Sequence, residues 1–152
     1  MIHGIGHIGI AVRDIERVVD QLCTCLDLEK PTINLVAERG MKVAVVRCGK
    51  VELELLEDIS PNGPLSGLVR EKGDFLHHLC LITDDIEKDI SGLEAKGVKM
   101  SQAIPRKGLR GKQISFAASG ILGDIPVELS EPEHKRKVNM VKGVWHKTLK
   151  VD

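Results

Sequence analysis

The chain has few aromatic residues and no net charge. Among 152 residues there is no tyrosine, one tryptophan and two phenylalanines. Proteins that bind single-stranded nucleic acid stack bases on aromatic side chains, so this scarcity argues against such a surface. The 22 basic and 22 acidic residues cancel, so no overall field attracts the chain to nucleic acid or to a membrane.

The sequence also lacks three other signals. No apolar run approaches the roughly 20 residues of a membrane-spanning helix. The first residues, "MIHGIGHIGIAV", contain no basic segment and no cleavage motif, so we expect no signal peptide. The four cysteines include no Cys-x-x-Cys pair, and we expect reduced thiols. These absences predict a cytoplasmic protein with one domain, residues 1–152, and no membrane or nucleic-acid partner.

Two parts of the chain resemble each other. The stretch "HIGIAVRDIERVVDQL", beginning at His7, aligns without a gap with "HLCLITDDIEKDISGL", beginning at His78, at an offset of 71 residues. Further on, "VELELLE" resembles "IPVELSE", and Glu54 aligns with Glu128 at an offset of 74. The repeat predicts one module used twice. We place the first module at about residues 4–58, the linker at 59–74, the second module at 75–131 and a basic C-terminal tail at 132–152.

Each module has the pattern of one strand, one helix and three further strands. Alternating apolar residues predict the first strand of each copy. Asp14 in the first copy, and Asp84 or Asp85 in the second, are suited to cap the helix that follows. We expect these helices to end near Leu28 and Gly97, and a short linker helix at 64–71. The expected strands are 4–12, 33–38, 42–48, 50–57, 75–82, 99–104, 113–118 and 125–130.

The repeat selects four candidate metal ligands. A lone histidine or glutamate in a strand is usually a packed or surface residue, but here one of each recurs at matching positions. Two imidazoles and two carboxylates suit a divalent ion such as Zn, Ni, Co or Mn. Glu52 lies on the same strand face as Glu54, but it aligns with Pro126, which cannot be a ligand. The predicted metal ligands are therefore His7, Glu54, His78 and Glu128.

The adjacent histidines of "GDFLHHLC" are expected to have different roles. Successive side chains of a strand point to opposite faces. Because His78 aligns with His7, we expect His78 to point into the cleft and His77 to point away from it and be structural. A ligating imidazole must be neutral, so we expect metal loss as the pH falls below about 6.5 and His78 takes up a proton.

These motifs resemble those of the vicinal oxygen chelate superfamily, which includes glyoxalase I, and within it those of the methylmalonyl-CoA epimerases. The resembling stretches are "HIGIAVRDIE", the segment from "VELELLED" through "GDFLHHLC" to "EAKGV", and "GLRGKQISF" with "PVELSE", over about residues 4–131. The resemblance implies an α+β fold in which two tandem βαβββ modules form a curved eight-stranded mixed sheet around a metal cleft. It also implies metal-ligand roles for the four residues that the repeat selects.

The resemblance further implies a divalent-metal-dependent epimerase, commonly a homodimer, that acts on methylmalonyl-CoA through an enolate. Glu128 or Glu54 is then expected to be the base that moves the α-proton. The segment "PRKGLRGK" offers cations for the phosphates of an acyl-CoA: Arg106, Lys107, Arg110 and Lys112. Two alternatives have the same fold: a glyoxalase I-like lyase or other metal-dependent isomerase, and a non-catalytic protein that binds small molecules.

Overall fold

The computed structural model describes residues 1–110 and 112–132, and the basic tail predicted after Pro132 lies outside them. No helix in the described part of the chain is long and apolar enough to cross a membrane. The elements are β1 (Ile2–Ala11), α1 (Ile15–Leu26), β2 (Asn34–Val36), the short 3₁₀ helix η1 (Ala37–Arg39), β3 (Met41–Cys48), β4 (Val51–Asp58), α2 (Ser66–Lys72), β5 (Phe75–Thr83), α3 (Ile86–Glu94), β6 (Arg106–Lys107), β7 (Gln113–Leu122) and β8 (Ile125–Ser130).

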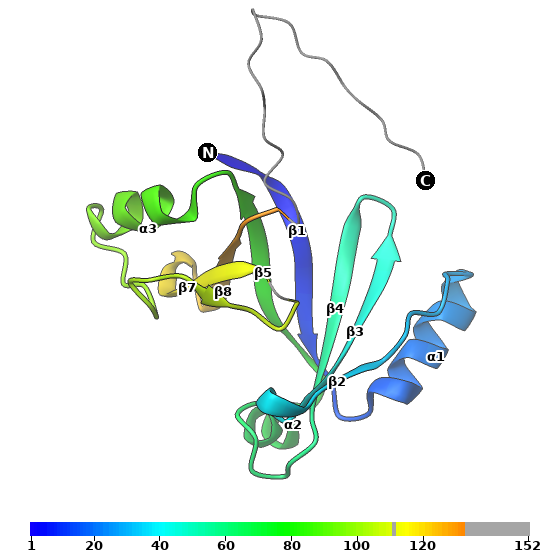
Figure 1. The fold of residues 1–152 in the computed structure, drawn as a ribbon. Coiled ribbons are helices and arrows are strands. Elements are labelled where there is room, and N and C mark those ends of the chain that lie inside the picture. Colours follow the sequence, from blue (N-terminus) through cyan, green and yellow to red (C-terminus); the bar gives the residue numbers. More distant parts are fainter. Residues whose placement is uncertain (111, 133–152) are drawn as a thin grey trace, which may run out of the picture.

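The eight strands form one mixed sheet in the order β2-β3-β4-β1-β5-β8-β7-β6. Each module contributes four neighbouring strands, and the second half of the order repeats the first in reverse. Within each module the first and last strands pair in parallel, β1 with β4 and β5 with β8, while β1 and β5 pair antiparallel across the centre. The sheet curls into an open half-barrel (Figure 1). The predicted α+β fold with a curved eight-stranded sheet is confirmed.

The long helices begin where the sequence predicts. The Asp14 side chain accepts a hydrogen bond from Arg17 N at 2.9 Å, and the Asp85 side chain accepts one from Lys88 N at 3.1 Å. These bonds satisfy amide groups that the first turn of a helix leaves free. Asp85, rather than Asp84, is therefore the cap of α3. The helix α1 ends at Leu26, two residues earlier than predicted, because Asp27 adopts a left-handed conformation.

The helices cover the convex side of the sheet and leave its concave side open. Ile15, Val19 and Cys23 recur every four residues on α1 and are buried against strands β3 and β4. On α3, Ile86 and Ile90 form a smaller cluster with Leu129 of β8. The two helices lie at opposite outer flanks of the sheet, and α2 lies at the end where the linker crosses (Figure 1).

One predicted strand is wrong. Residues 99–104 form only an isolated bridge, between Met100 and Ala117, and the edge strand β6 is the two-residue segment Arg106–Lys107. The edge of a sheet has hydrogen-bond partners on one side only, so local sequence specifies such a strand weakly. As a result, the basic segment begins as a strand and continues as a loop that reaches back over the open face of the sheet.

Candidate functional site

The four predicted ligands come from the four central strands. His7 lies on β1, Glu54 on β4, His78 on β5 and Glu128 on β8. The register follows the repeat: Glu54 is opposite Gly9, two residues after His7, and Glu128 is opposite Cys80, two residues after His78. The two modules therefore bring equivalent residues to one point on the concave face. We call these four residues the quartet.

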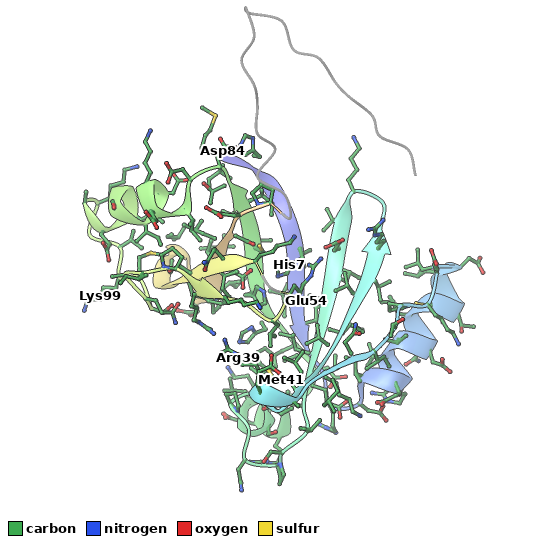
Figure 2. All side chains as sticks on the ribbon, viewed as in Figure 1. His7, Arg39, Met41, Glu54, Asp84 and Lys99 are labelled. Carbon is green, nitrogen blue, oxygen red and sulfur yellow. The ribbon has the colours of Figure 1, made fainter. Side chains whose placement is uncertain are left out.

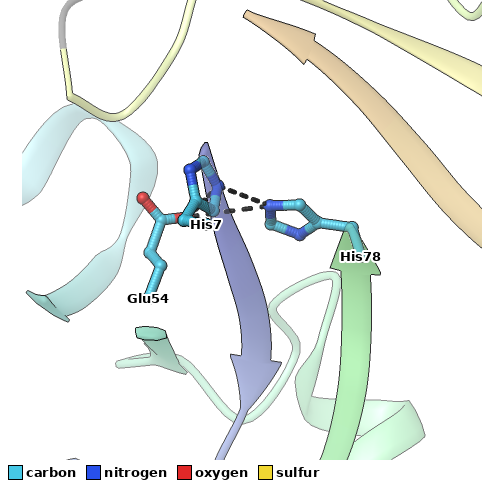
Figure 3. A group of neighbouring side chains, drawn as sticks. All are labelled: His7, Glu54 and His78. Carbon is cyan, nitrogen blue, oxygen red and sulfur yellow. Dashed lines mark hydrogen bonds and ion pairs between the residues drawn. The ribbon is translucent and has the colours of Figure 1, made fainter. Parts of the chain in front are cut away.

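The quartet side chains converge within a few ångströms. His7 Nε2 lies 2.9 Å from His78 Nε2, 3.4 Å from Glu54 Oε2 and 3.6 Å from Glu128 Oε1. His78 Nε2 lies 3.8 Å from Glu54 Oε2 and 3.9 Å from Glu128 Oε2. Figure 3 shows His7, Glu54 and His78 meeting head to head, and Figure 2 places His7 and Glu54 in the hollow between the two halves of the sheet.

This arrangement fits a divalent metal. Nitrogen and oxygen atoms that bind one zinc-like ion at roughly 2.0–2.2 Å lie about 3–4 Å from each other, and the five distances above are in this range. The quartet residues are 2–6% exposed, yet all carry polar or ionisable groups. Burying such groups together is costly unless they neutralise one another or hold an ion. The quartet could therefore hold a metal ion.

The two carboxylates of the quartet differ in their protonation. Burial raises the pKa of Glu54, but the contact with His7 and the positive charge of Arg110 outweigh it, and the pKa lies below its usual range. Burial raises the pKa of Glu128 to about 7, and the negative charge of Glu54 acts in the same direction. Near neutral pH, Glu54 is thus a permanent anion, whereas Glu128 can hold or release a proton.

Burial keeps the second imidazole neutral. It lowers the pKa of His78 to about 3, because a charged ring would be poorly solvated there. A neutral ring has a free electron pair for a metal, which suits the predicted role. The pKa near 6.5 expected for His78 is thus too high for the metal-free chain, in which Glu128 takes up a proton at a higher pH than His78.

The ambiguity between Glu52 and Glu54 has a structural answer. Glu52 does face the concave side, but its Oε2 accepts a hydrogen bond from Arg110 Nη2 at 2.6 Å. Its other oxygen lies 3.8 Å from Arg47 Nε. Arg110 Nε lies 3.9 Å from Glu54 Oε1 and so connects the ion pair to the quartet. Glu52 is thus occupied by arginines, while Glu54 reaches the two histidines.

A cavity of about 400 Å³ opens over the quartet. Three of the four basic residues selected from the sequence line this cavity: Arg106, Arg110 and Lys112. The fourth, Lys107, is exposed and does not line it. Arg106 Nε and Arg110 Nη1 are buried and find no hydrogen-bond partner within residues 1–110 and 112–132. A buried guanidinium nitrogen without a partner is unfavourable. The cavity wall therefore presents unsatisfied donors that an anionic ligand would complete.

Sequence analysis missed two residues near the site, one that lines the cavity and one beside the quartet. Arg39, from η1, lines the cavity and donates from Nη2 to Lys107 O at 3.0 Å. No sequence signal marks it, because η1 lies outside the stretches that align between the two modules. Cys80 has its Sγ close to His7 and Glu128. Burial raises the pKa of the Cys80 thiol, so it remains protonated and donates to Glu128. Its position two residues after His78, on the same strand face, was the available signal.

The predicted orientation of His77 is wrong. In the pairing of β1 with β5, Gly9 is opposite His78 and Ile10 is opposite Leu76, so His77 is an extra residue at a β-bulge. The bulge interrupts the alternation of side chains, and both histidines line the cavity. His77 Nδ1 lies 2.8 Å from His78 Nδ1.

Known proteins share this architecture. The chain is 31% identical over 127 residues to the uncharacterized protein YqjC of Bacillus subtilis, covering 84% of this chain and 91% of that protein. It is 27% identical over 128 residues to the mitochondrial methylmalonyl-CoA epimerase of Homo sapiens, covering 84% and 73%. The crystal structure of methylmalonyl-CoA epimerase from Mycobacterium tuberculosis superposes with a TM-score of 0.79 at 20% identity, covering 88% and 91%; at this identity it shows the fold alone.

The match to a family extends over most of the described residues. Residues 6–117 match the Glyoxalase/Bleomycin resistance protein/Dioxygenase superfamily. This range includes three of the quartet residues and both helices that flank the sheet. The chain belongs to the Glyoxalase/Bleomycin resistance protein/Dioxygenase superfamily.

Proposed function

We propose that this protein is a divalent-metal-dependent epimerase that acts on the α-carbon of an acyl-CoA thioester of the methylmalonyl-CoA class. The observation that carries the proposal is the pairing of a metal-suited quartet with one carboxyl group whose pKa is about 7. The identity of 27% to a methylmalonyl-CoA epimerase supports the same conclusion. Of the two carboxylates, we assign proton transfer to Glu128, which is also a proposed ligand, and a ligand role alone to Glu54.

The reaction requires a base and a means to stabilise negative charge. A bound divalent ion would act as a Lewis acid for the oxygen on which charge develops. In the metal-free chain the pKa of Glu128 is raised to about 7, so when it is not coordinated to the ion Glu128 has the acidity to take the α-proton and return it near neutral pH. The Cys80 thiol donates to Glu128 and orients it. The quartet side chains are only 2–6% exposed, so these groups have little contact with solvent.

The basic wall of the cavity suits an anionic substrate. Arg110 and Arg106 each offer an unpaired buried nitrogen, and their charges act on Glu54 and Glu128 respectively. We propose that these two arginines face the acyl end of the substrate, where a carboxylate would complete their hydrogen bonds. We propose that Arg39 and Lys112, which line the same cavity, and the exposed Lys107 contact the phosphates of the CoA end. The resemblance also leads us to propose a homodimer, which light scattering of the purified protein tests.

The deciding experiment measures hydrogen–deuterium exchange at the α-carbon. Protein purified without chelator is incubated with methylmalonyl-CoA in D₂O, with and without added Co²⁺, and the label is followed by mass spectrometry. We expect exchange that depends on the metal. The hemithioacetal of methylglyoxal and glutathione serves as the control substrate, and its turnover in place of exchange would indicate the lyase alternative. Metal binding without turnover of either compound would contradict the proposed reaction.

A further inference from the structure

The strand β5 presents two neighbouring imidazoles to one cavity. The bulge at His77 turns its ring toward the ring of His78, and the ring centroids are 5.1 Å apart with planes at 88°. The contact between the rings is a single N···N approach of 2.8 Å between the two Nδ1 atoms. Such an approach is a hydrogen bond only when one nitrogen carries a proton and the other does not.

The surroundings of His78 decide which ring donates. Its Nε2 faces His7 Nε2 at 2.9 Å and the carboxylates of the quartet, so this nitrogen is the one that would bind a metal and must be free of a proton. A neutral imidazole has one proton, which must then be on Nδ1. His78 therefore donates from Nδ1, and His77 Nδ1 accepts.

We propose that His77 is a positioning residue: by accepting the Nδ1–H of His78, it holds the Nε2 electron pair of His78 toward the quartet. The same bond places the proton of neutral His77 on its Nε2, which becomes the donor that His77 offers to a ligand in the cavity. Histidine ligands in metalloproteins generally donate their second N–H to a carboxylate, a carbonyl or water. Here a second histidine takes that place.

The first module has no such partner. Under the repeat, the position equivalent to His77 is Gly6, which has no side chain. A Cβ at Gly6 would lie 2.5 Å from Ile82 Cδ1, so the space next to it is filled by β5. The support is thus a property of the second module and of its bulge. The inference rests on the proposed metal site, but not on the proposed reaction, because metal affinity and ring tautomer can be measured without turnover.

Three variants at position 77 test whether a hydrogen-bond acceptor near the position of Nδ1 is required. They distinguish this requirement from the effect of side-chain size and from that of a polar group placed elsewhere. Asn places its amide oxygen near the position of Nδ1, Gln places its amide near Nε2, and Ala provides neither. We expect His77→Ala and His77→Gln to weaken Co²⁺ binding about tenfold or more, and His77→Asn to stay within about threefold of wild type, measured by competition with a chelator. Leu76→Ala, at the exposed neighbour, is the control and should leave the affinity unchanged.

The result that would overturn the proposal is equally specific. Unchanged affinity in His77→Ala, or an affinity of His77→Asn as low as that of His77→Ala, would show that the acceptor has no role. Nitrogen-15 NMR of the wild type loaded with diamagnetic Zn²⁺ provides a second readout that needs no variant to fold. We expect the proton of His78 on Nδ1 and that of His77 on Nε2, and the opposite pattern on His78 would refute the inference.

Discussion

The two modules have the same strand order but different interiors. In the first, α1 packs over β3 and β4 with a buried cluster of seven residues: Val12, Ile15, Val19, Cys23, Ala44, Val46 and Leu55. In the second, the cluster under α3 has three: Ile86, Ile90 and Leu129. The second module also contributes the bulge, Cys80, and two arginines that line the cavity, Arg106 and Arg110. The first module is the better packed, and the second contains more of the groups that distinguish one ligand from another.

The quartet shows what the repeat conserves and what it does not. Each module supplies one histidine and one glutamate at equivalent register positions, which is the requirement for a shared ion. The equivalent of Gly9 under the offset of 71 residues is Cys80. Gly9 leaves room for the ring of His78, while Cys80 donates to Glu128. The two carboxylates have different pKa values although the backbone places them alike, because burial raises the pKa of Glu128 while the contact with His7 and the charge of Arg110 lower that of Glu54.

The largest expected effect concerns this difference between the carboxylates. Glu128→Gln should lower the rate of α-proton exchange by about 10²–10⁴-fold even at saturating metal, because the amide cannot take up the proton. Glu54→Gln should instead weaken metal binding, and excess Co²⁺ should restore most of its exchange. Exchange rates are measured over a metal titration. Equal losses of exchange rate in both variants at saturating metal would show that the two carboxylates do not have different roles.

Glu52→Gln is the control for these variants. Glu52 is on the same strand face as Glu54 but pairs with Arg110, so its loss should leave metal affinity near that of the wild type. Weakening as large as that of Glu54→Gln would mean that the first module supplies its ligand differently.

The next prediction concerns the space that Gly9 of the first module leaves for the ring of His78 of the second. A Cβ at Gly9 would lie 2.1 Å from Cε1 and 2.2 Å from Nδ1 of His78. The ring would have to move, so Gly9→Ala should weaken Co²⁺ binding by about tenfold to a hundredfold, comparable to loss of ligand orientation. Affinity is measured with a competing chelator, and thermal unfolding of the metal-free protein reports on the fold.

Gly92→Ala in α3 is the matched control. A Cβ there meets nothing within 4 Å. The change should leave metal affinity as it is and stabilise the helix by about 0.4–1 kcal/mol. If Gly9→Ala binds metal as tightly as Gly92→Ala does, the ring of His78 is not confined by β1.

The repeat makes the fold and the quartet predictable from the sequence. The two histidines match at an offset of 71 residues and the two glutamates at an offset of 74, which identifies equivalent positions far apart in the chain. The alternation of side chains along each strand then predicts that they share one face. The sequence does not locate the bulge at His77, because pairing with β1 creates it. Nor does it locate the bond of Arg110 to Glu52, which are 58 residues apart. The misplaced strand at residues 99–104 lies at the sheet edge, where few partners constrain the register.

The smallest effect is a dependence of metal affinity on pH that Glu128 of the second module should produce. Burial raises the pKa of Glu128 from 4.5 to about 7 in the metal-free protein, so below pH 7 a metal must displace a proton from this group. Affinity should fall by up to about tenfold per pH unit between about pH 7 and 5.5, since one proton is released per ion bound. Burial lowers the pKa of His78 to about 3, so this ring adds no proton in that range.

The stability of the metal-free protein should change in the opposite sense. Because the pKa of Glu128 is higher in the folded chain than in the unfolded one, the folded state holds the proton more tightly. This contribution is complete below about pH 4.5 and is lost as the pH rises to about 7. Glu128→Gln, which has no proton to exchange, should flatten both dependences, as measured by chelator competition and thermal unfolding. If metal affinity still depends on pH in this variant, another ligand must be the group that takes up the proton. The proposed difference between the carboxylates of the two modules would then be wrong.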